Sequence, residues 1–361
     1  EIFMMQNRTG TLGLEAACSA VSWTTLDQKH LWGRNYDFDR LAEGTGMTFL
    51  PRGLKYQGVV SDEKMPAPHT AAYACAGVGI LMEPTPVLYE GMNEKGLMGG
   101  QLYYRGFASY EKVSCPDEHS LQPPFLVYHL LAQCASVEEA VLWLRNKIKL
   151  ADIPFFGTVP PLHWSFHDAS GETIVVEPDR DGLHIYRNTL GVMTNSPGYG
   201  WHRLNLLNYA GLRDRDYPTV ELDGETLDQC FSGSGFQGLP GDWSSPSRFV
   251  RLAFMKKYAS KGRNEEEGVS RMLHLFRSAA FPLGMVKVSH QSHVTELDRT
   301  VVPFDYTVYT SIYCAESLKA YWTTYENWRV QCLELGALLN RREPLTISLG
   351  NEPDFLDRTP R

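Results

Sequence analysis

Two strand-like stretches stand near the start of the chain, Cys18-Ser-Ala-Val-Ser-Trp-Thr-Thr25 and His30-Leu-Trp-Gly-Arg-Asn-Tyr-Asp-Phe38. Apolar and polar residues alternate in the first stretch, as they do in a strand that buries one face. The turn-like residues 27–29 separate the two stretches. The pattern therefore predicts two neighbouring strands, with Arg34 and Asp37 of the second brought beside Cys18.

Cys18 is the residue in this region with the clearest chemical potential. Residues 1–17 read as a polar leader that ends in two alanines, and removal of this leader would leave Cys18 with a free amine. An α-amino group has a pKa of about 7.7–8.0, so it can accept the thiol proton near neutral pH. Arg34 and Asp37, 16 and 19 residues further on, would favour the thiolate and hold the amine. The alternative interpretation is a buried structural cysteine beside a surface Arg–Asp pair.

The rest of the chain alternates blocks of strands with blocks of helices. Predicted strands up to residue 104 are followed by helices at 125–134 and 140–148, a strand meander at 162–186, helices at 201–209, 245–258 and 265–276, and strands at 306–314 and 320–328. Ser136 and Glu139 form a capping box, and Ser245 is the predicted N-cap of its helix. This order differs from strict βαβ alternation and favours antiparallel sheets covered by helices. Because no linker-like segment divides the chain, we expect one domain over residues 18–361.

Composition excludes several classes of protein. The chain has 361 residues, of which 43% are hydrophobic and 21% charged, so it can bury a sizeable core. Its net charge of −8 argues against a nucleic-acid partner. The longest apolar run, Ala71–Met82, is too short for a membrane span of about 20 residues. We therefore expect a soluble, cytoplasmic protein without a membrane partner, with secretion left open because the chain begins without Met.

Searches for cofactor and metal motifs give no match. The seven cysteines contain no CxxC pair, and the chain has no HExxH helix, no GxxxxGK[ST] loop and no GxSxG elbow. His163 and His167 are four residues apart in a predicted strand and are interpreted as core or surface histidines. We therefore predict an enzyme that needs neither metal nor cofactor.

Several separated motifs follow one another from Cys18 to Val330. They are Cys18-Ser19, Gly33-Arg-Asn-Tyr-Asp37, Gly91-Met-Asn-Glu-Lys-Gly-Leu97, Gly191-Val-Met-Thr-Asn-Ser-Pro197, Gly238-Leu-Pro-Gly-Asp242, Ser247-Arg-Phe-Val-Arg251, Tyr309-Thr-Ser311, Cys314 and Tyr325-Glu-Asn327. In this order the chain resembles one family, the choloylglycine hydrolases, which include penicillin V acylases and conjugated bile salt hydrolases.

The resemblance implies a fold, a reaction and a set of catalytic residues. The fold is that of N-terminal-nucleophile hydrolases, an α+β architecture of two stacked antiparallel sheets between helical layers (αββα). The reaction is hydrolysis of a linear amide, with a small-molecule amide as substrate. Cys18 matches the nucleophile, Arg34 and Asp37 match the residues beside its sulfur and amine, and Arg248 matches a further active-site arginine. Tyr103, through its backbone N–H, and Asn195, through its side chain, match the oxyanion hole.

The remaining expectations concern maturation, substrate and assembly. We expect autocatalytic cleavage at Ala17–Cys18 and a precursor that is inactive while the leader is attached. Tyr103 favours penicillin V as substrate, whereas Gly33-Arg34-Asn35 is closer to the version in bile salt hydrolases, and N-acyl homoserine lactones are a third possibility. An unprocessed, precursor-like binding protein is the alternative from another class. The family, together with the turn-rich segment 209–238, implies a homotetramer in which that segment reaches a neighbour.

Overall fold

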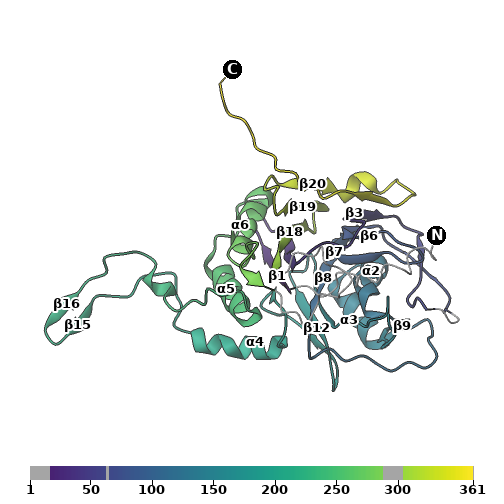
Figure 1. Ribbon diagram of the computed structural model, residues 1–361, viewed down its shortest axis with the longest axis horizontal. Coiled ribbons are helices and arrows are strands. Elements are labelled where there is room, and N and C mark those ends of the chain that lie inside the picture. Colours follow the sequence, from purple (N-terminus) through teal and green to yellow (C-terminus); the bar gives the residue numbers. More distant parts are fainter. Residues whose placement is uncertain (1–16, 62–64, 288–303, 361) are drawn as a thin grey trace.

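The computed structural model describes residues 17–61, 65–287 and 304–360. Two antiparallel β-sheets lie face to face, and helices cover the outer face of each (Figure 1). This is the layered α+β architecture, αββα, that the resemblance implies. Of the predicted leader, only Ala17 falls within the described residues.

The first sheet carries the cysteine. It consists of β1 (Ala17–Thr24), β2 (His30–Phe38), β14 (Val192–Met193), β17 (Val286–Lys287), β18 (Phe304–Cys314), β19 (Lys319–Thr324) and β20 (Gln331–Glu334). The strand order is β14–β1–β2–β18–β19–β20, with β17 paired to β18. Cys18 lies opposite Tyr36 in the β1–β2 ladder, and Ala17 lies opposite Asp37. The predicted pairing of the first two strands is confirmed.

The second sheet lies against the first. It consists of β3 (Thr45–Leu50), β6 (Cys75–Ile80), β7 (Val87–Asn93), β8 (Met98–Tyr103), β11 (Leu162–His167), β12 (Thr173–Asp179), β13 (Gly182–Tyr186) and β21 (Leu345–Ile347). Its order is β13–β12–β11–β8–β7–β6–β3–β21. The β7–β8 hairpin turns at Gly96, whose φ of +84° suits glycine. Buried side chains of both sheets and of the helices form a contiguous apolar core.

Helices cover both outer faces. They are α2 (Leu126–Gln133), α3 (Val137–Asn146), α4 (Tyr199–Asn205), α5 (Ser245–Tyr258) and α6 (Glu265–Arg277), with single 3₁₀ turns η1 (Pro123–Phe125), η2 (Leu206–Tyr209), η3 (Ser234–Phe236) and η4 (Leu335–Leu338). α5 packs on β1 and β14, and α6 packs on β2 and β18. α2 packs on β6, β7 and β8 of the other sheet, with α3 beside it (Figure 1).

The capping signals were accurate at one helix and displaced at another. The Ser136 side chain accepts a hydrogen bond from the Glu139 N–H, as the capping box predicts. The Glu139 carboxylate accepts its bond from the Ala135 N–H, one residue before the N-cap. The prediction of Ser245 as an N-cap is wrong. Ser245 is the first residue of α5, and Ser244 precedes it without a side-chain cap.

The last predicted strand is too long. Residues 320–328 were expected to form one strand, but β19 ends at Thr324. There the Thr324 N–H donates to the Asn327 carbonyl and the Asn327 N–H donates to the Thr324 hydroxyl. These local bonds close a turn, which competes with the ladder for the same backbone groups.

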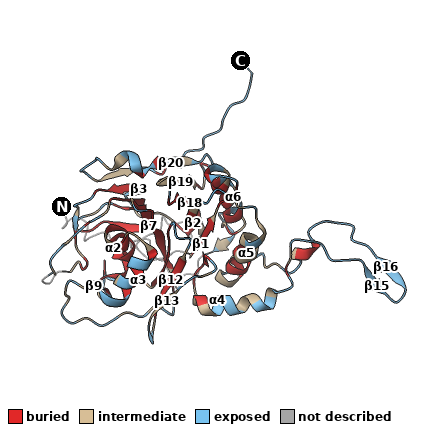
Figure 2. Cartoon of the chain, turned by 180° about the vertical axis from the view of Figure 1, so that it is seen from behind, coloured by how far each residue is buried: buried red, intermediate tan, exposed pale blue. Residues whose placement is uncertain are grey.

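Three short pairs of strands complete the fold. They are β4 (Lys55–Tyr56) with β5 (His69–Thr70), β9 (Ser120–Leu121) with β10 (Lys149–Leu150), and β15 (Val220–Leu222) with β16 (Glu225–Leu227). The β15–β16 hairpin lies at the tip of an arm that extends away from the layered body (Figure 1). Figure 2 shows that this arm is almost entirely exposed, as are the last residues of the chain. No helix of the described residues is long and apolar enough to cross a membrane.

Candidate active site

Cys18 lies at the centre of a group of buried polar side chains. Its side chain is 0% exposed. Its backbone N–H donates to Asn195 Oδ1 at 2.9 Å, and its carbonyl accepts a hydrogen bond from Arg248 Nη1 at 2.5 Å. Its Sγ is contacted by Arg34 Nη2. The nitrogen, the carbonyl and the sulfur of one residue are therefore each held by a different side chain.

The alternation of side chains along β2 places these groups on two faces of the sheet. Arg34 lies on the face that meets the second sheet, since its guanidinium reaches Glu90 of β7. Asn35, the next residue, points the other way and donates to the Phe276 carbonyl of α6. Asp37 is two residues beyond Asn35 and therefore shares the helix-covered face. Arg34 and Asp37, both predicted to lie beside Cys18, thus approach it from opposite sides.

Arg34 is held by a dense set of acceptors. Its Nη1 donates to Glu90 Oε2 at 3.0 Å, to the Gln101 carbonyl at 2.8 Å and to the Tyr89 carbonyl at 3.3 Å. Burial by itself would lower the pKa of Arg34, but the nearby Cys18 and Glu90 charges raise it above its ordinary value. The guanidinium is therefore a fixed positive charge directed at the sulfur.

Asp37 lies on the other side of the cysteine and is fully buried. Its Oδ1 accepts a hydrogen bond from Thr307 Oγ1, while its Oδ2 has no hydrogen-bond partner among the described residues. Burial raises the pKa of Asp37 to about 7, although the Arg248 charge opposes this rise. A carboxylate at this place is well suited to receive a cationic amine.

Asn195 follows β14, in a loop that reaches the cysteine. Its Oδ1 accepts hydrogen bonds from the Cys18 N–H and from Arg248 Nη2, which orients the amide so that Nδ2 donates to the Tyr103 carbonyl at 2.9 Å. His202 Nε2 lies 2.9 Å from the Asn195 carbonyl and holds the loop from behind. The structure thus brings Tyr103 and Asn195 together through the Tyr103 carbonyl. The proposed part of the Tyr103 N–H in an oxyanion hole stays a prediction.

Arg248 comes from α5 and faces the cysteine backbone. In addition to the Cys18 carbonyl and Asn195, it donates to Ser19 Oγ at 2.7 Å and to the Trp243 carbonyl at 2.8 Å. Burial lowers its pKa, and the charge of Asp37 opposes this change. The structure therefore gathers all six predicted residues, Cys18, Arg34, Asp37, Tyr103, Asn195 and Arg248, at one place.

The protonation state of Cys18 follows from its surroundings. Burial raises the pKa of its thiol to about 11, with Arg34 lowering it and Asp37 raising it. The sulfur is therefore a thiol near neutral pH and needs a base before it can attack. With Ala17 attached, the Cys18 nitrogen is an amide and cannot supply that base.

Comparison with known proteins agrees with this geometry. Residues 18–346 match the family described as linear amide C-N hydrolases, choloylglycine hydrolase family. This chain belongs to the choloylglycine hydrolase family.

Relatives and solved structures extend the match. The chain is 31% identical to a bile salt hydrolase/transferase of Clostridium perfringens over 88% of this chain and 92% of that protein. It is 32% identical to a bile salt hydrolase/transferase of Lactiplantibacillus plantarum over 94% of this chain and 98% of the other. A crystal structure of the conjugated bile acid hydrolase from C. perfringens superposes with a TM-score of 0.83 at 30% identity, covering 94% and 99% of the two chains. Penicillin V acylase from Agrobacterium tumefaciens shares the fold, with a TM-score of 0.67 at 20% identity over 89% and 87% of the two chains.

One buried residue of this choloylglycine hydrolase site was missed by the sequence analysis. Glu90 is 0% exposed and accepts hydrogen bonds from Arg34, Tyr309 and Ser311. Its signal was present in the sequence, because Glu90 is the lone charge in the apolar strand Val87-Leu-Tyr-Glu-Gly-Met92 and directly precedes a quoted motif. A charge is buried in this way only when partners are provided for it.

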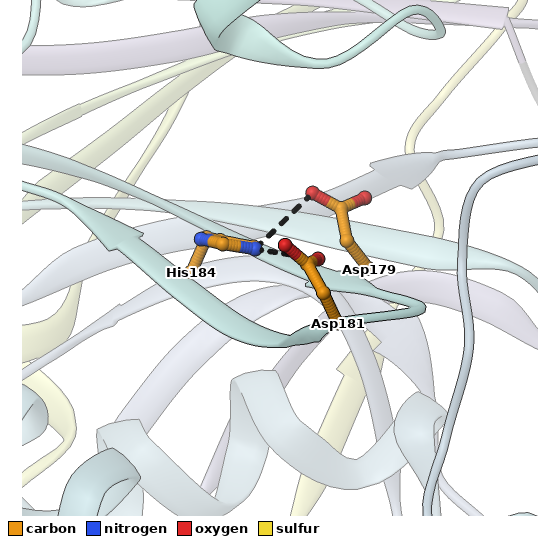
Figure 3. Close-up of side chains that lie close together, drawn as sticks. All are labelled: Asp179, Asp181 and His184. Atoms are coloured by element: carbon orange, nitrogen blue, oxygen red, sulfur yellow. Dashed lines mark hydrogen bonds and ion pairs between the residues drawn. The ribbon is translucent and has the colours of Figure 1, made fainter.

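A separate cluster has the residue types of a metal site. Asp179, Asp181 and His184, at the turn between β12 and β13, bring their ligand atoms within 4.8 Å of one another, and they are the one such group of the described residues. Figure 3 shows His184 directed at both carboxylates, with Nε2 2.8 Å from Asp181 Oδ1 and 3.9 Å from Asp179 Oδ2. The hydrogen bond to Asp181 raises the pKa of His184, so a protonated His184 offsets part of the negative charge of the two carboxylates. It lies at the exposed edge of the second sheet, and the prediction that no metal is needed stays a prediction.

Proposed function

We propose that this chain hydrolyses the amide bond of conjugated bile salts, with Cys18 as nucleophile after the residues before it have been removed. The observation that carries the proposal is the contact of Cys18 with three groups at once: Arg34 at the sulfur, Asn195 at the nitrogen and Arg248 at the carbonyl. The choice of bile salts is supported by relatives with 31% and 32% identity that bear this activity in their names.

The earlier preference for penicillin V is not confirmed. It rested on Tyr103, and the penicillin V acylase that shares the fold is only 20% identical. Glycine and taurine conjugates of bile acids therefore take the place of penicillin V as the expected substrates. Penicillin V becomes the comparison substrate, because both molecules join an apolar acyl group to a nitrogen leaving group.

The positions of two residues have further support from relatives. Two solved variants of the C. perfringens conjugated bile acid hydrolase replace a cysteine in one case and an arginine 16 residues later in the other. Cys18 and Arg34 are also 16 residues apart. This equal spacing supports the pairing of nucleophile and arginine that we propose here.

The first half of the reaction is acyl transfer to sulfur. The α-amine of mature Cys18 accepts the thiol proton, and Sγ attacks the substrate carbonyl carbon to form a C–S bond. The carbonyl oxygen becomes an oxyanion, which the second N–H of Asn195 Nδ2 and the Tyr103 N–H would stabilise by about 2.7–4 kcal/mol each. Collapse breaks the C–N bond, and the Cys18 ammonium returns its proton to the leaving nitrogen. A thioester and a free amino acid or taurine result.

The second half is hydrolysis of the thioester. The amine, again neutral, accepts a proton from water, and the hydroxide that forms adds to the thioester carbonyl. Loss of the C–S bond releases the bile acid, and the sulfur recovers its proton from the ammonium. Throughout both halves Asn195 Oδ1 accepts an N–H from the amine and thereby directs its lone pair. Asp37 balances the charge of the ammonium form.

Maturation is expected to use the same cysteine. Attack of Cys18 Sγ on the Ala17 carbonyl forms a thioester and transfers the thiol proton to the released nitrogen, and water then cleaves the thioester. This step leaves residues 1–17 as a separate peptide and Cys18 with a free amine. Cys18→Ala should then retain the full-length mass, whereas the native chain should lose 17 residues.

Activity against three substrates tests the proposed function. We expect the mature enzyme to release glycine and taurine from their cholate conjugates with a higher kcat/KM than that for penicillin V. Loss of activity after treatment with iodoacetamide, but not with EDTA, should accompany this preference. A mature enzyme that prefers penicillin V would restore the earlier choice, and one that cleaves none of the three would refute the proposal.

Assembly into a homotetramer is also proposed. The arm carries exposed apolar side chains, among them Val220, Leu222, Leu227 and Phe231, which water solvates poorly. Contact with a neighbour through these residues would cover them, and homo-oligomers usually close with point symmetry. Light scattering should give about four times the monomer mass, and deletion of residues 219–228 should lower it. A native mass near 40 kDa at micromolar concentration would contradict the tetramer.

A further inference from the structure

Glu90 is a buried acid whose three hydrogen-bond donors all come from the opposite sheet. It lies on β7, and its Oε2 accepts from Arg34 Nη1 and from the Tyr309 hydroxyl, each at 3.0 Å. Its Oε1 accepts from Ser311 Oγ at 3.0 Å. β2 and β18, which carry these donors, belong to the sheet of the nucleophile. The carboxylate is therefore a point at which the second sheet contacts the catalytic one through hydrogen bonds.

The residues around this carboxylate leave space for it and place its donors together. In the β2–β18 ladder Arg34 lies opposite Ser311, and Tyr36 lies opposite Tyr309, so the donors form one cluster. Gly100 lies opposite Glu90 on β8, and a Cβ there would come within 2.6 Å of Glu90 Cβ and 2.7 Å of the Trp32 ring. A side chain at position 100 would thus displace Glu90 or Trp32.

The contacts of Arg34 divide between its two terminal nitrogens. Nη1 donates hydrogen bonds to Glu90 and to two backbone carbonyls, while Nη2 contacts Cys18 Sγ. Because a guanidinium is planar and rigid, fixing Nη1 also fixes the direction of Nη2. Glu90, the one charged acceptor of Nη1, therefore controls the group that touches the sulfur.

We propose that Glu90 is a positioning residue for the nucleophile: through Arg34 it keeps one guanidinium nitrogen on Cys18 Sγ and offsets the guanidinium charge, so that the sulfur rests as a thiol. This inference rests on the proposed function, in which the amine of Cys18 is the base. A resting thiol still carries the proton that the amine must accept and later give to the leaving nitrogen. A thiolate formed by loss of this proton to solvent would leave the amine with no proton to give to the leaving nitrogen.

The charges around the site determine whether loss of the Glu90 charge raises or lowers the pKa of Cys18. Arg34 and Asp37 of β2 and Arg248 of α5 face Cys18. Tyr36 of β2, Tyr89 of β7, and Tyr309 and Tyr313 of β18 surround Arg34 and Glu90, and burial raises the pKa of each tyrosine, so all four are neutral near pH 7. Removing the negative charge of Glu90 leaves Arg34 uncompensated, which favours the thiolate and lowers the pKa of Cys18.

The experiment compares Glu90→Gln with the native mature enzyme. The rate of iodoacetamide alkylation is followed against pH on the peptide that begins with Cys18, so the other six cysteines do not interfere. We expect the midpoint of the Glu90→Gln profile to fall by about one pH unit or more. We expect kcat to fall on the order of 10²-fold with KM nearly unchanged, since Glu90 acts through another residue and does not touch substrate.

Two further variants separate this role from a structural one. Glu177→Gln is the matched control, because Glu177 is an equally buried acid of the second sheet whose hydrogen bonds go to the Tyr199 N–H and His163, and its alkylation midpoint should not move. Glu90→Asp keeps the charge and should keep the native midpoint while kcat falls. It also serves as the test if Glu90→Gln does not fold.

The outcomes are distinguishable. A native midpoint in folded Glu90→Gln, or a lowered midpoint in Glu90→Asp, would overturn the positioning role. Native enzyme that keeps its amidase activity after complete alkylation of Cys18 would instead refute the proposed function.

Discussion

Two buried arginines meet at Cys18, and their surroundings differ. Arg34, on the face between the sheets, donates to a buried carboxylate, Glu90, and its pKa is raised by the surrounding charges in spite of burial. Arg248, on the helix-covered face, donates to two carbonyls, a hydroxyl and an amide oxygen, and burial lowers its pKa. Among the described residues no carboxylate forms a salt bridge with Arg248.

The difference relates to what each arginine touches. Arg34 contacts a sulfur whose charge would change during the proposed reaction. An arginine paired with a carboxylate changes the electric field at that sulfur less than an unpaired arginine does. Arg248 contacts backbone and amide oxygens, which stay neutral, and its charge also faces Asp37, the expected partner of the amine. In the proposed reaction, one arginine would therefore act on the nucleophile, while the other would order the groups around its amine.

Replacing Cys18 removes the group on which both arginines converge. We expect Cys18→Ala to lose activity by about 10⁶-fold, the scale seen when a catalytic nucleophile is deleted. Cys332→Ala, at an exposed cysteine, is the control and should retain native kcat/KM. Substantial amidase activity in purified Cys18→Ala would show that neither arginine environment serves this cysteine.

The two arginines should differ in their cost to stability. Arg34→Met leaves Glu90 as an unpaired buried charge, so unfolding free energy should drop by about 3–5 kcal/mol. Arg248→Met leaves neutral acceptors and should cost about 1–3 kcal/mol. Urea denaturation of both variants in the Cys18→Ala background, where processing is absent, provides the measurement. Equal losses of unfolding free energy in the two variants would remove the distinction between the two arginines. The double variant Arg34→Met/Glu90→Gln should recover part of the stability lost in Arg34→Met.

Asp37, on the same face as Arg248, should make the stability of the folded chain depend on pH. Its pKa is about 7 in the folded chain, above its ordinary value of 3.8, so the folded state holds a proton that the unfolded state has released. Stability of uncleaved Cys18→Ala should therefore fall as pH rises from about 4 to about 7. Adding Asp37→Asn should flatten this slope, measured as the midpoint of urea denaturation at several pH values. A slope that persists unchanged in the double variant would show that Asp37 is ionised throughout.

The smallest expected difference in stability is between variants of two serines, one bound to Glu90 and the other to Arg248. Ser311 is the partner of Glu90 Oε1, so Ser311→Ala should cost about 2 kcal/mol. Ser19→Ala should cost about 1 kcal/mol, because Arg248 Nη1 keeps its bond to the Cys18 carbonyl. Both can be measured by urea denaturation in one background. A larger loss for Ser19→Ala would reverse the order that we assign to the two faces.

Much of the fold could be predicted from local patterns. The stretch His30–Phe38 has the observed bounds of β2, and the Ser136–Glu139 pattern located α3. Predictions failed where local signals compete: Ser245 resembles a cap but is already helical, and the turn at Thr324 interrupts an apolar stretch. Both of these failures are at element ends, where a single hydrogen bond decides between two conformations. The short strands β15, β16, β20 and β21 were not predicted.

Some residues of the site could also be found from local sequence, and others could not. Cys18, Arg34 and Asp37 could be found from the sequence because they lie on two adjacent strands, where spacing determines proximity. Motif resemblance placed Asn195 and Arg248. Side chains alternate between the two faces of a strand, so the spacing of Arg34 and Asp37 along β2 already implies that they point to opposite faces. Only the stacking of the layers decides which of these faces meets the second sheet and which meets the helices. The sequence marks Glu90 as the lone charge of an apolar strand, but its partners could be identified only in the folded protein, because they lie 56 to 221 residues away and are brought to it by the contact between the two sheets.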